Sequence, residues 1–127
     1  MTPQDTGIVL FAHGSRDPLW RAPIDAVAQA MATQLPDCVV RCAFLELTTP
    51  DLPTTVNELV HLGLRAVRIV PMFLGVGRHA REDLPELVRQ LRQQHPTLAI
   101  ELTLSVGEHP AMTQLMARIA LGLAPHP

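Results

Sequence analysis

Two histidines follow apolar, strand-like runs of the sequence and are the residues best suited to chemistry. His13 comes directly after residues 7–12, and His79 follows residues 66–73 and a short glycine-rich loop. Glu46 ends another such run and adds a carboxylate. Imidazole binds cobalt, iron and nickel and also accepts a proton near neutral pH. A resident zinc site needs three or four protein ligands, so this sparser set predicts an open site that transfers a divalent metal ion.

Arginine is the only side chain that gives the chain a permanent positive charge. All ten basic residues are arginine, which excludes a lysine Schiff base and a phosphate loop of the Lys-Ser/Thr kind. Arg16 follows His13 closely, and Arg78 and Arg81 flank His79. These guanidinium groups could pair with carboxylates of a ligand. The alternatives are that they are ordinary surface residues and that genome composition explains the missing lysines.

The hydrophobic pattern predicts four alternating strands and helices. Apolar runs indicate strands at 7–12, 38–45, 66–73 and 98–104, and helical spacing indicates helices at 22–35, 54–62, 80–94 and 110–123. We expect the third helix to become regular only near Asp83, because Pro85 falls in its first turns. Four βα units predict a single α/β domain over 1–127: a flavodoxin-like three-layer sandwich with a four-stranded parallel sheet in the order 2-1-3-4.

That strand order determines where the candidate residues should meet. Ligands of open parallel sheets bind at the carboxyl ends of the strands, where the strand order reverses. Here the reversal lies between the first and third strands, so His13 and His79 are expected to face each other, with Glu46 close by.

Composition excludes several other classes of protein. A net charge of −2 offers no basic surface for nucleic acid, and no apolar run approaches the ~18 residues of a membrane span. The acidic, polar start is unlike a signal peptide. Cys38 and Cys42, the only cysteines, suit a reducing cytoplasm. We expect both to be small core residues.

Three weaker motifs have other interpretations. Residues 75–80 match the dinucleotide pattern G-x-G-x-x-A, but Glu101, the acid some twenty residues later, falls inside a strand. Ser15 lies near His13 without the G-x-S-x-G elbow of serine hydrolases. His109, which precedes Pro110, is interpreted first as the start of a helix.

Four segments together resemble one enzyme family. They are Phe11–Pro18, Ala43–Glu46 followed by Thr49-Pro50, Gly77–Pro85 and Val106–Pro110. In this order they resemble the signatures of the class II tetrapyrrole chelatases, which include the CbiX-type sirohydrochlorin cobaltochelatases and their iron and nickel relatives. The resemblance spans residues 7–121.

The resemblance implies insertion of a divalent ion, Co²⁺ in the first instance, into sirohydrochlorin on the way to cobalamin. His13 and His79 match the paired histidines that bind the ion and take protons from the pyrrole nitrogens, and Glu46 matches an acidic position beside them. The metal is a substrate, and no resident cofactor is expected. Iron or nickel insertion, or a non-catalytic module that binds the tetrapyrrole or the metal, are the alternatives. The residues expected to bind the substrate are Ser15, Arg16, Arg78 and Arg81.

Longer members of that family close two similar halves over one cleft, and this chain corresponds to one half. A homodimer could rebuild the pair by twofold symmetry. The predicted last helix is apolar nearly all round, which is typical of a buried or interfacial helix.

Overall fold

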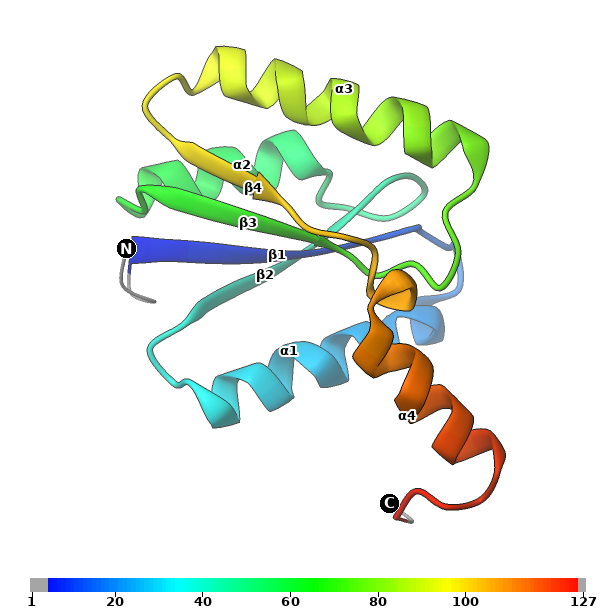
Figure 1. The fold of residues 1–127 in the computed structure, drawn as a ribbon. Helices are drawn as coiled ribbons and strands as arrows, with labels where there is room; N and C mark the ends of the chain where they lie inside the picture. Colours follow the sequence, from blue (N-terminus) through cyan, green and yellow to red (C-terminus); the bar gives the residue numbers. More distant parts are fainter. Residues whose placement is uncertain (1–4, 126–127) are drawn as a thin grey trace.

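A four-stranded parallel sheet forms the centre of the computed structural model, which describes residues 5–125 (Figure 1). Its strands are β1 (Thr6–Ala12), β2 (Val39–Phe44), β3 (Ala66–Pro71) and β4 (Ala99–Leu102). The order across the sheet is β2-β1-β3-β4, which confirms the predicted α/β topology. The carboxyl ends of β1 and β3, the two central strands, therefore lie side by side at the point where the strand order reverses.

Helices cover the two faces of this sheet unequally. One face carries α1 (Ala22–Gln34), and the other carries α2 (Leu52–His61) and α3 (Arg78–Gln94) (Figure 1). The main core lies between the sheet and the α2–α3 pair. Its members include Val9, Phe11, Val56, Leu59, Val67, Ile69, Leu84, Val88 and Leu91. Two short helices, η2 (Pro18–Arg21) and η3 (Val106–Glu108), precede α1 and α4 (Pro110–Ala120).

Helix α2 begins two residues earlier than expected because Asp51 caps it. The Asp51 carboxylate accepts a hydrogen bond from the amide of Thr54 at 2.9 Å, and Pro53 lies in the first turn, where a missing N–H costs nothing. Hydrogen bonds from the side chain and the backbone of Thr54 hold the pKa of Asp51 below its usual value. The sequence contains this capping signal directly before Leu52.

Helix α3 starts at Arg78, so the expectation that it becomes regular only near Asp83 is wrong. Pro85 lies inside the helix and, having no N–H, removes one hydrogen bond. The apolar stripe of the helix outweighs that loss, because its members are buried against the sheet. They are Ala80, Leu84, Val88 and Leu91.

The cysteines are half-buried, and the expectation that both belong to the core is wrong. Both lie at β2, against which α1 packs without burying any of its own residues. The Cys42 sulfur lies 3.9 Å from an Asp25 carboxylate oxygen. Burial, followed by the charge of Asp25, raises the pKa of the Cys42 thiol.

The last helix does not return to the sheet. In Figure 1, α4 points away from the sheet and from α1, and none of its residues is buried. The sequence predicts an apolar helix that is buried or interfacial, and the chain alone does not bury it. Within residues 5–125, no helix has the length and hydropathy that crossing a membrane requires.

Candidate functional site

His13 follows the carboxyl end of β1 and lies against an aromatic ring from the loop after the neighbouring strand. Its ring centroid is 4.5 Å from that of Phe73, with 37° between the ring planes. Phe73 follows β3 and is buried, whereas the side chain of His13 is 52% exposed. The imidazole is therefore held on one face by the core and remains accessible at the predicted edge of the sheet.

Glu46 approaches the same histidine from the loop after β2. Its Oε1 lies 3.4 Å from His13 Nδ1 and 3.4 Å from the amide nitrogen of Gly14. A proton on Nδ1 faces this carboxylate and leaves the Nε2 lone pair free. The pair is thus arranged so that Nε2 can bind a metal ion or accept a proton.

A tight turn at Leu47 directs the loop that carries Glu46. The amide of Thr48 donates to the carbonyl of Glu46 at 2.7 Å, and Leu47 between them has a φ of 64°. A hydrogen bond from residue i+2 to residue i with positive φ at the centre is a γ-turn of the rare, strained kind. Backbone strain of this sort is often stored at functional sites. Here the strained residue, Leu47, lies between Glu46 and Thr48, the two residues whose side chains contact the His13 loop.

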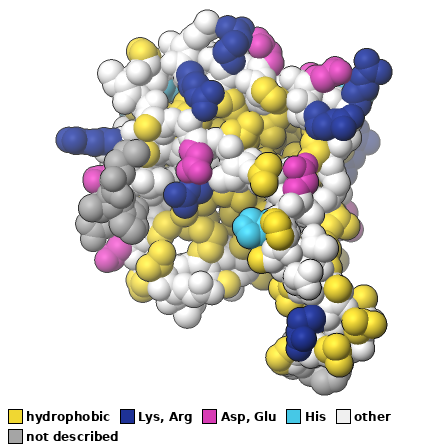
Figure 2. Space-filling view, in the orientation of Figure 1, with side chains coloured by type: hydrophobic (Ala, Val, Ile, Leu, Met, Phe, Trp, Pro, Cys, Tyr) yellow, Lys and Arg dark blue, Asp and Glu magenta, His cyan; other side chains and the backbone are white. Residues whose placement is uncertain are grey.

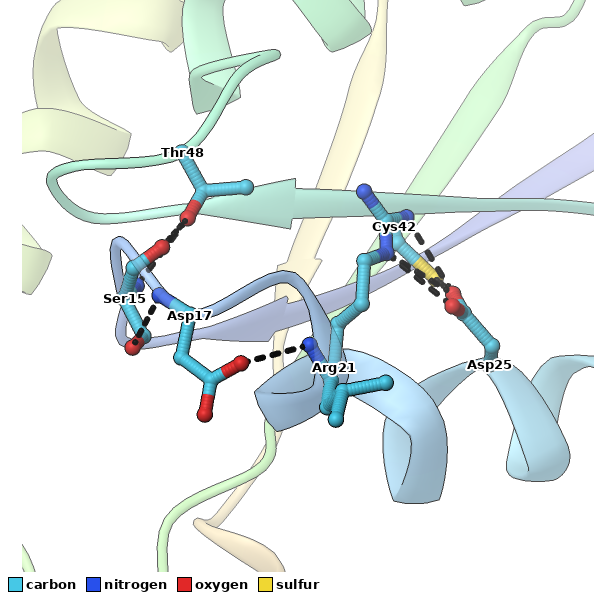
Figure 3. A network of polar contacts seen from close by, with 7 residues as sticks. Ser15, Asp17, Arg21, Asp25, Cys42 and Thr48 are labelled. Carbon is cyan, nitrogen blue, oxygen red and sulfur yellow. Dashed lines mark hydrogen bonds and ion pairs between the residues drawn. The ribbon is translucent and has the colours of Figure 1, made fainter.

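Thr48 clamps that loop through its hydroxyl group (Figure 3). The hydroxyl accepts from the amide of Ser15 at 3.0 Å and donates to the carbonyl of Ser15 at 2.9 Å. Thr48 is absent from the residues predicted to matter. It could have been found by the same reasoning that selected Glu46, because both follow a strand at the edge where parallel strands place their ligands.

Two glycines allow neighbouring loops to touch backbone to backbone. A Cβ on Gly14 would lie 1.4 Å from the carbonyl oxygen of Glu46, and a Cβ on Gly107 would lie 1.8 Å from that of Leu74. Any other residue would therefore force the loops apart. The four loops at the carboxyl edge are consequently joined in pairs, β1 with β2 and β3 with β4.

The far end of the His13 loop is also fixed (Figure 3). Asp17 accepts from the amide of Leu19 at 2.9 Å and caps η2. Arg21 lies over the ring of Phe44, 4.8 Å from its centroid, and its guanidinium binds both carboxylate oxygens of Asp25. Hydrogen bonding to Asp25 raises the pKa of Arg21. The loop between β1 and α1 is therefore anchored before and after its exposed residues.

His79 lies in the first turn of α3 and is exposed. Its neighbour Ala80 lines a hollow of about 270 Å³ together with Phe73 and Asp83. No group of three or more His, Cys, Asp or Glu side chains in residues 5–125 is close enough to hold a metal ion. The structure thus joins His13 to Glu46 without bringing His79 into one cluster with them, and joint action of the two histidines stays a prediction.

The predicted substrate-binding residues are accessible to different degrees. The Arg78 guanidinium donates to Glu82 at 3.1 Å, one helical turn away. Arg16 and Arg81 are exposed and form no ion pair within the described residues. The Ser15 hydroxyl accepts from the amide of Asp17 at 3.1 Å, so it supports its own loop. Their contact with a substrate stays a prediction.

The weaker motifs have structural roles in this fold. Residues 75–80 form the end of the loop before α3 and the first turn of that helix. Glu101 lies within β4 and binds Arg68 at 2.9 Å, so it is not placed at a strand end to bind a ribose, as the dinucleotide pattern requires. His109 caps α4, since its Nδ1 accepts from the amide of Ala111 at 3.1 Å. The interpretation of His109 as a helix start is confirmed.

Comparison with known proteins identifies the family. The CbiX family profile matches residues 7–120, and these residues include all of the sheet except Thr6, the first residue of β1, and every residue of the candidate site. The chain belongs to the CbiX family. Among curated relatives, a sirohydrochlorin cobaltochelatase of Methanococcoides burtonii is 32% identical over 83 residues, which make up 65% of this chain and 63% of that protein. Another from Methanothermobacter thermautotrophicus is 32% identical over 82 residues, or 65% and 57% of the two chains. The chain thus aligns with less than two thirds of these relatives.

Solved structures share the fold. A protein described as a cobalamin (vitamin B12) biosynthesis CbiX protein of Marinobacter aquaeolei VT8 superposes with a TM-score of 0.79 at 29% identity, covering 92% of this chain and 95% of that one. The sirohydrochlorin chelatase SirB of Bacillus subtilis subspecies spizizenii, solved with cobalt, gives 0.77 at 22% identity. That match covers 94% of this CbiX-family chain and 51% of SirB.

Proposed function

We propose that this chain is a subunit of a sirohydrochlorin chelatase that inserts Co²⁺ into the tetrapyrrole. The observation that carries the proposal is the accessible His13, paired with Glu46 at the switch point of a CbiX-family fold. The curated relatives named above are sirohydrochlorin cobaltochelatases. A cytoplasmic location, which the two isolated thiols favour, belongs to the same proposal.

His13 has the arrangement that metal insertion demands. The reaction removes two protons from pyrrole nitrogens, so it needs a base at the macrocycle. Because Nδ1 of His13 faces Glu46, its Nε2 atom is free to do one of two things. It binds the incoming ion, or it takes one of these two protons. His79, on the first turn of α3, is the residue proposed for the complementary task. Arg16, Arg78 and Arg81 are proposed to hold the acidic side groups of the ring bidentately.

A second copy of the chain is needed to enclose a macrocycle. The hollow beside Phe73 measures about 270 Å³, whereas pockets for drug-sized ligands measure roughly 300–1,000 Å³, and a tetrapyrrole is at the large end of such ligands. This supports the homodimer that the sequence predicts, with one such edge from each protomer facing the substrate.

The test is anaerobic incubation of the protein with sirohydrochlorin and Co²⁺ while the visible spectrum of the tetrapyrrole is followed. We expect insertion well above the uncatalysed rate. Parallel reactions with Fe²⁺ and Ni²⁺ decide between the cobalt, iron and nickel activities. Tight binding of the tetrapyrrole without acceleration by any of the three ions would refute the enzyme and favour a non-catalytic binding module.

Histidine variants connect the activity to the site. His13→Ala and His79→Ala are each expected to abolish insertion while leaving the folded state intact. His61→Ala is the matched control, because His61 is exposed on α2 and its ring nitrogen contacts the carbonyl of Asn57 at 2.8 Å. Insertion at the wild-type rate in His13→Ala and His79→Ala, as in the control, would refute the proposed roles of His13 and His79.

A further inference from the structure

One side of α4 is an apolar stripe that its own chain leaves uncovered. Met112, Leu115, Met116 and Ile119 recur at spacings of three and four, so they share one face of the helix. Leu115 is 47% exposed and Ile119 is 59% exposed. Among the elements that the structure describes, α4 packs closely only against η3, the turn before it.

A strip of the sheet is uncovered on the same side of the molecule. Helix α1 packs on β1 and β2, and the neighbouring strands β3 and β4 have no helix over this face (Figure 1). Here Arg68 and Glu101 form an exposed ion pair. Between this strip and the start of α4 lies a hollow of about 620 Å³, and its lining is mostly apolar (Figure 2). The lining includes Val70, Thr103, Leu104, Val106, Met112 and Leu115.

The total exposed area is larger than a compact monomer of this size should have. The chain exposes 8339 Å², whereas a folded monomer of 13.9 kDa exposes about 6,700 Å² by the usual scaling with mass. The excess is roughly 1,600 Å². Permanent homodimers bury about 1,000–2,500 Å² on each partner, so the excess equals what one such interface would remove.

We propose that two copies of this chain exchange α4, each helix laying its apolar stripe on the uncovered β3–β4 strip of the other. The exchange specifies the interface of the dimer proposed above. A symmetric pair covers both surfaces at once, because every chain has one unpartnered helix and one unpartnered strip. A different protein would have to supply two unrelated surfaces to achieve the same.

The dimensions of helix and strip agree. From Met112 to Ile119 the helix rises about 10.5 Å, and the strip from Thr103 back to Ala99 extends about 13 Å. A partner helix that enters at the carboxyl edge therefore places Met112 near Thr103 and Ile119 towards Arg68. In this arrangement the carboxyl edges of the two sheets, with His13 in each, face one another across the space that the macrocycle needs.

Sedimentation equilibrium of the full chain tests the assembly. We expect a mass of about 28 kDa, twice 13.9 kDa, and a shift of the dissociation constant by at least 100-fold in Leu115→Asp/Ile119→Asp. Thr113→Asp/Ala117→Asp is the matched control, with the same charge and spacing on the other side of α4, and should remain dimeric. A wild-type chain that is monomeric at all concentrations overturns the proposal.

A cysteine pair distinguishes exchange from a helix that folds back on its own sheet. In Arg68→Cys/Ile119→Cys, mild oxidation should give a covalent dimer on a non-reducing gel, while the wild type, with only Cys38 and Cys42, should give none. An oxidised species of monomer mass would show α4 on its own sheet and would overturn the exchange. Neither measurement uses metal or tetrapyrrole, so failure of the exchange and failure of the chelatase activity are recorded separately.

Discussion

Gly14→Ala should disable the site by moving His13 rather than by removing any chemical group. The added Cβ would lie 1.4 Å from the carbonyl oxygen of Glu46, and real Cβ contacts are not shorter than 3.0 Å. One loop must therefore shift by about 1.6 Å, the difference between these distances. A misplacement of about 1 Å at a reacting group can cost ~100-fold in rate, so we expect metal insertion to slow by at least about 100-fold.

The fold should survive this substitution because only the carboxyl-edge loops are affected. Overpacking costs typically about 1–3 kcal/mol, which urea unfolding followed by circular dichroism would measure. Gly75→Ala is the control, since a Cβ there meets nothing within 4 Å. It should leave the free energy of unfolding unchanged and the rate of metal insertion within twofold of the wild-type rate. In a spectrum of imidazole protons, Gly14→Ala should shift the His13 signals and leave those of His61 in place.

Two outcomes would refute the reasoning. Insertion at the wild-type rate in Gly14→Ala would mean that the position of His13 is unimportant. An equal loss in Gly75→Ala would mean that the loops respond to any added methyl group rather than to the contact between Gly14 and Glu46.

Three further substitutions test the residues that hold the site. Thr48→Val removes both hydrogen bonds to Ser15. It should lower kcat about 10-fold, as loss of an orienting partner typically does, with little change in KM. Thr48→Ser should restore kcat. Leu47→Gly relieves a positive φ and should raise the free energy of unfolding by up to about 1 kcal/mol while insertion slows, measured by urea unfolding and initial rates. Asp51→Ala should cost about 1 kcal/mol through loss of a helix cap. Because the pKa of Asp51 is lowered in the folded state, this difference from the wild type should be complete at neutral pH and shrink as the pH falls through that pKa.

The sequence was sufficient to predict the sheet and the edge that carries the site. Continuous apolar runs alternate with helical spacing, and for such a chain right-handed crossovers leave few topologies. Strand order then places the ends of β1 and β3 together, which is why the sequence alone predicts that His13 lies at the site. The prediction for the start of α3 is wrong because Pro85, considered alone, indicates an interrupted first turn. The sequence shows the local cost of a proline in a helix, but it does not show that the apolar stripe of α3 is buried against the sheet.

The contacts that fix His13 depend on backbone geometry that no periodic pattern contains. Thr48 reaches Ser15 because Leu47 adopts a left-handed conformation that leucine rarely takes, and Gly14 touches Glu46 only because two loops cross without side chains between them.

The helix α4 presents the reverse case. Its apolar stripe is evident in the sequence, yet burial within one chain and burial in a partner give the same spacing of residues. Only the uncovered β3–β4 strip distinguishes them, since a helix that covered its own sheet would have closed the hollow beneath it.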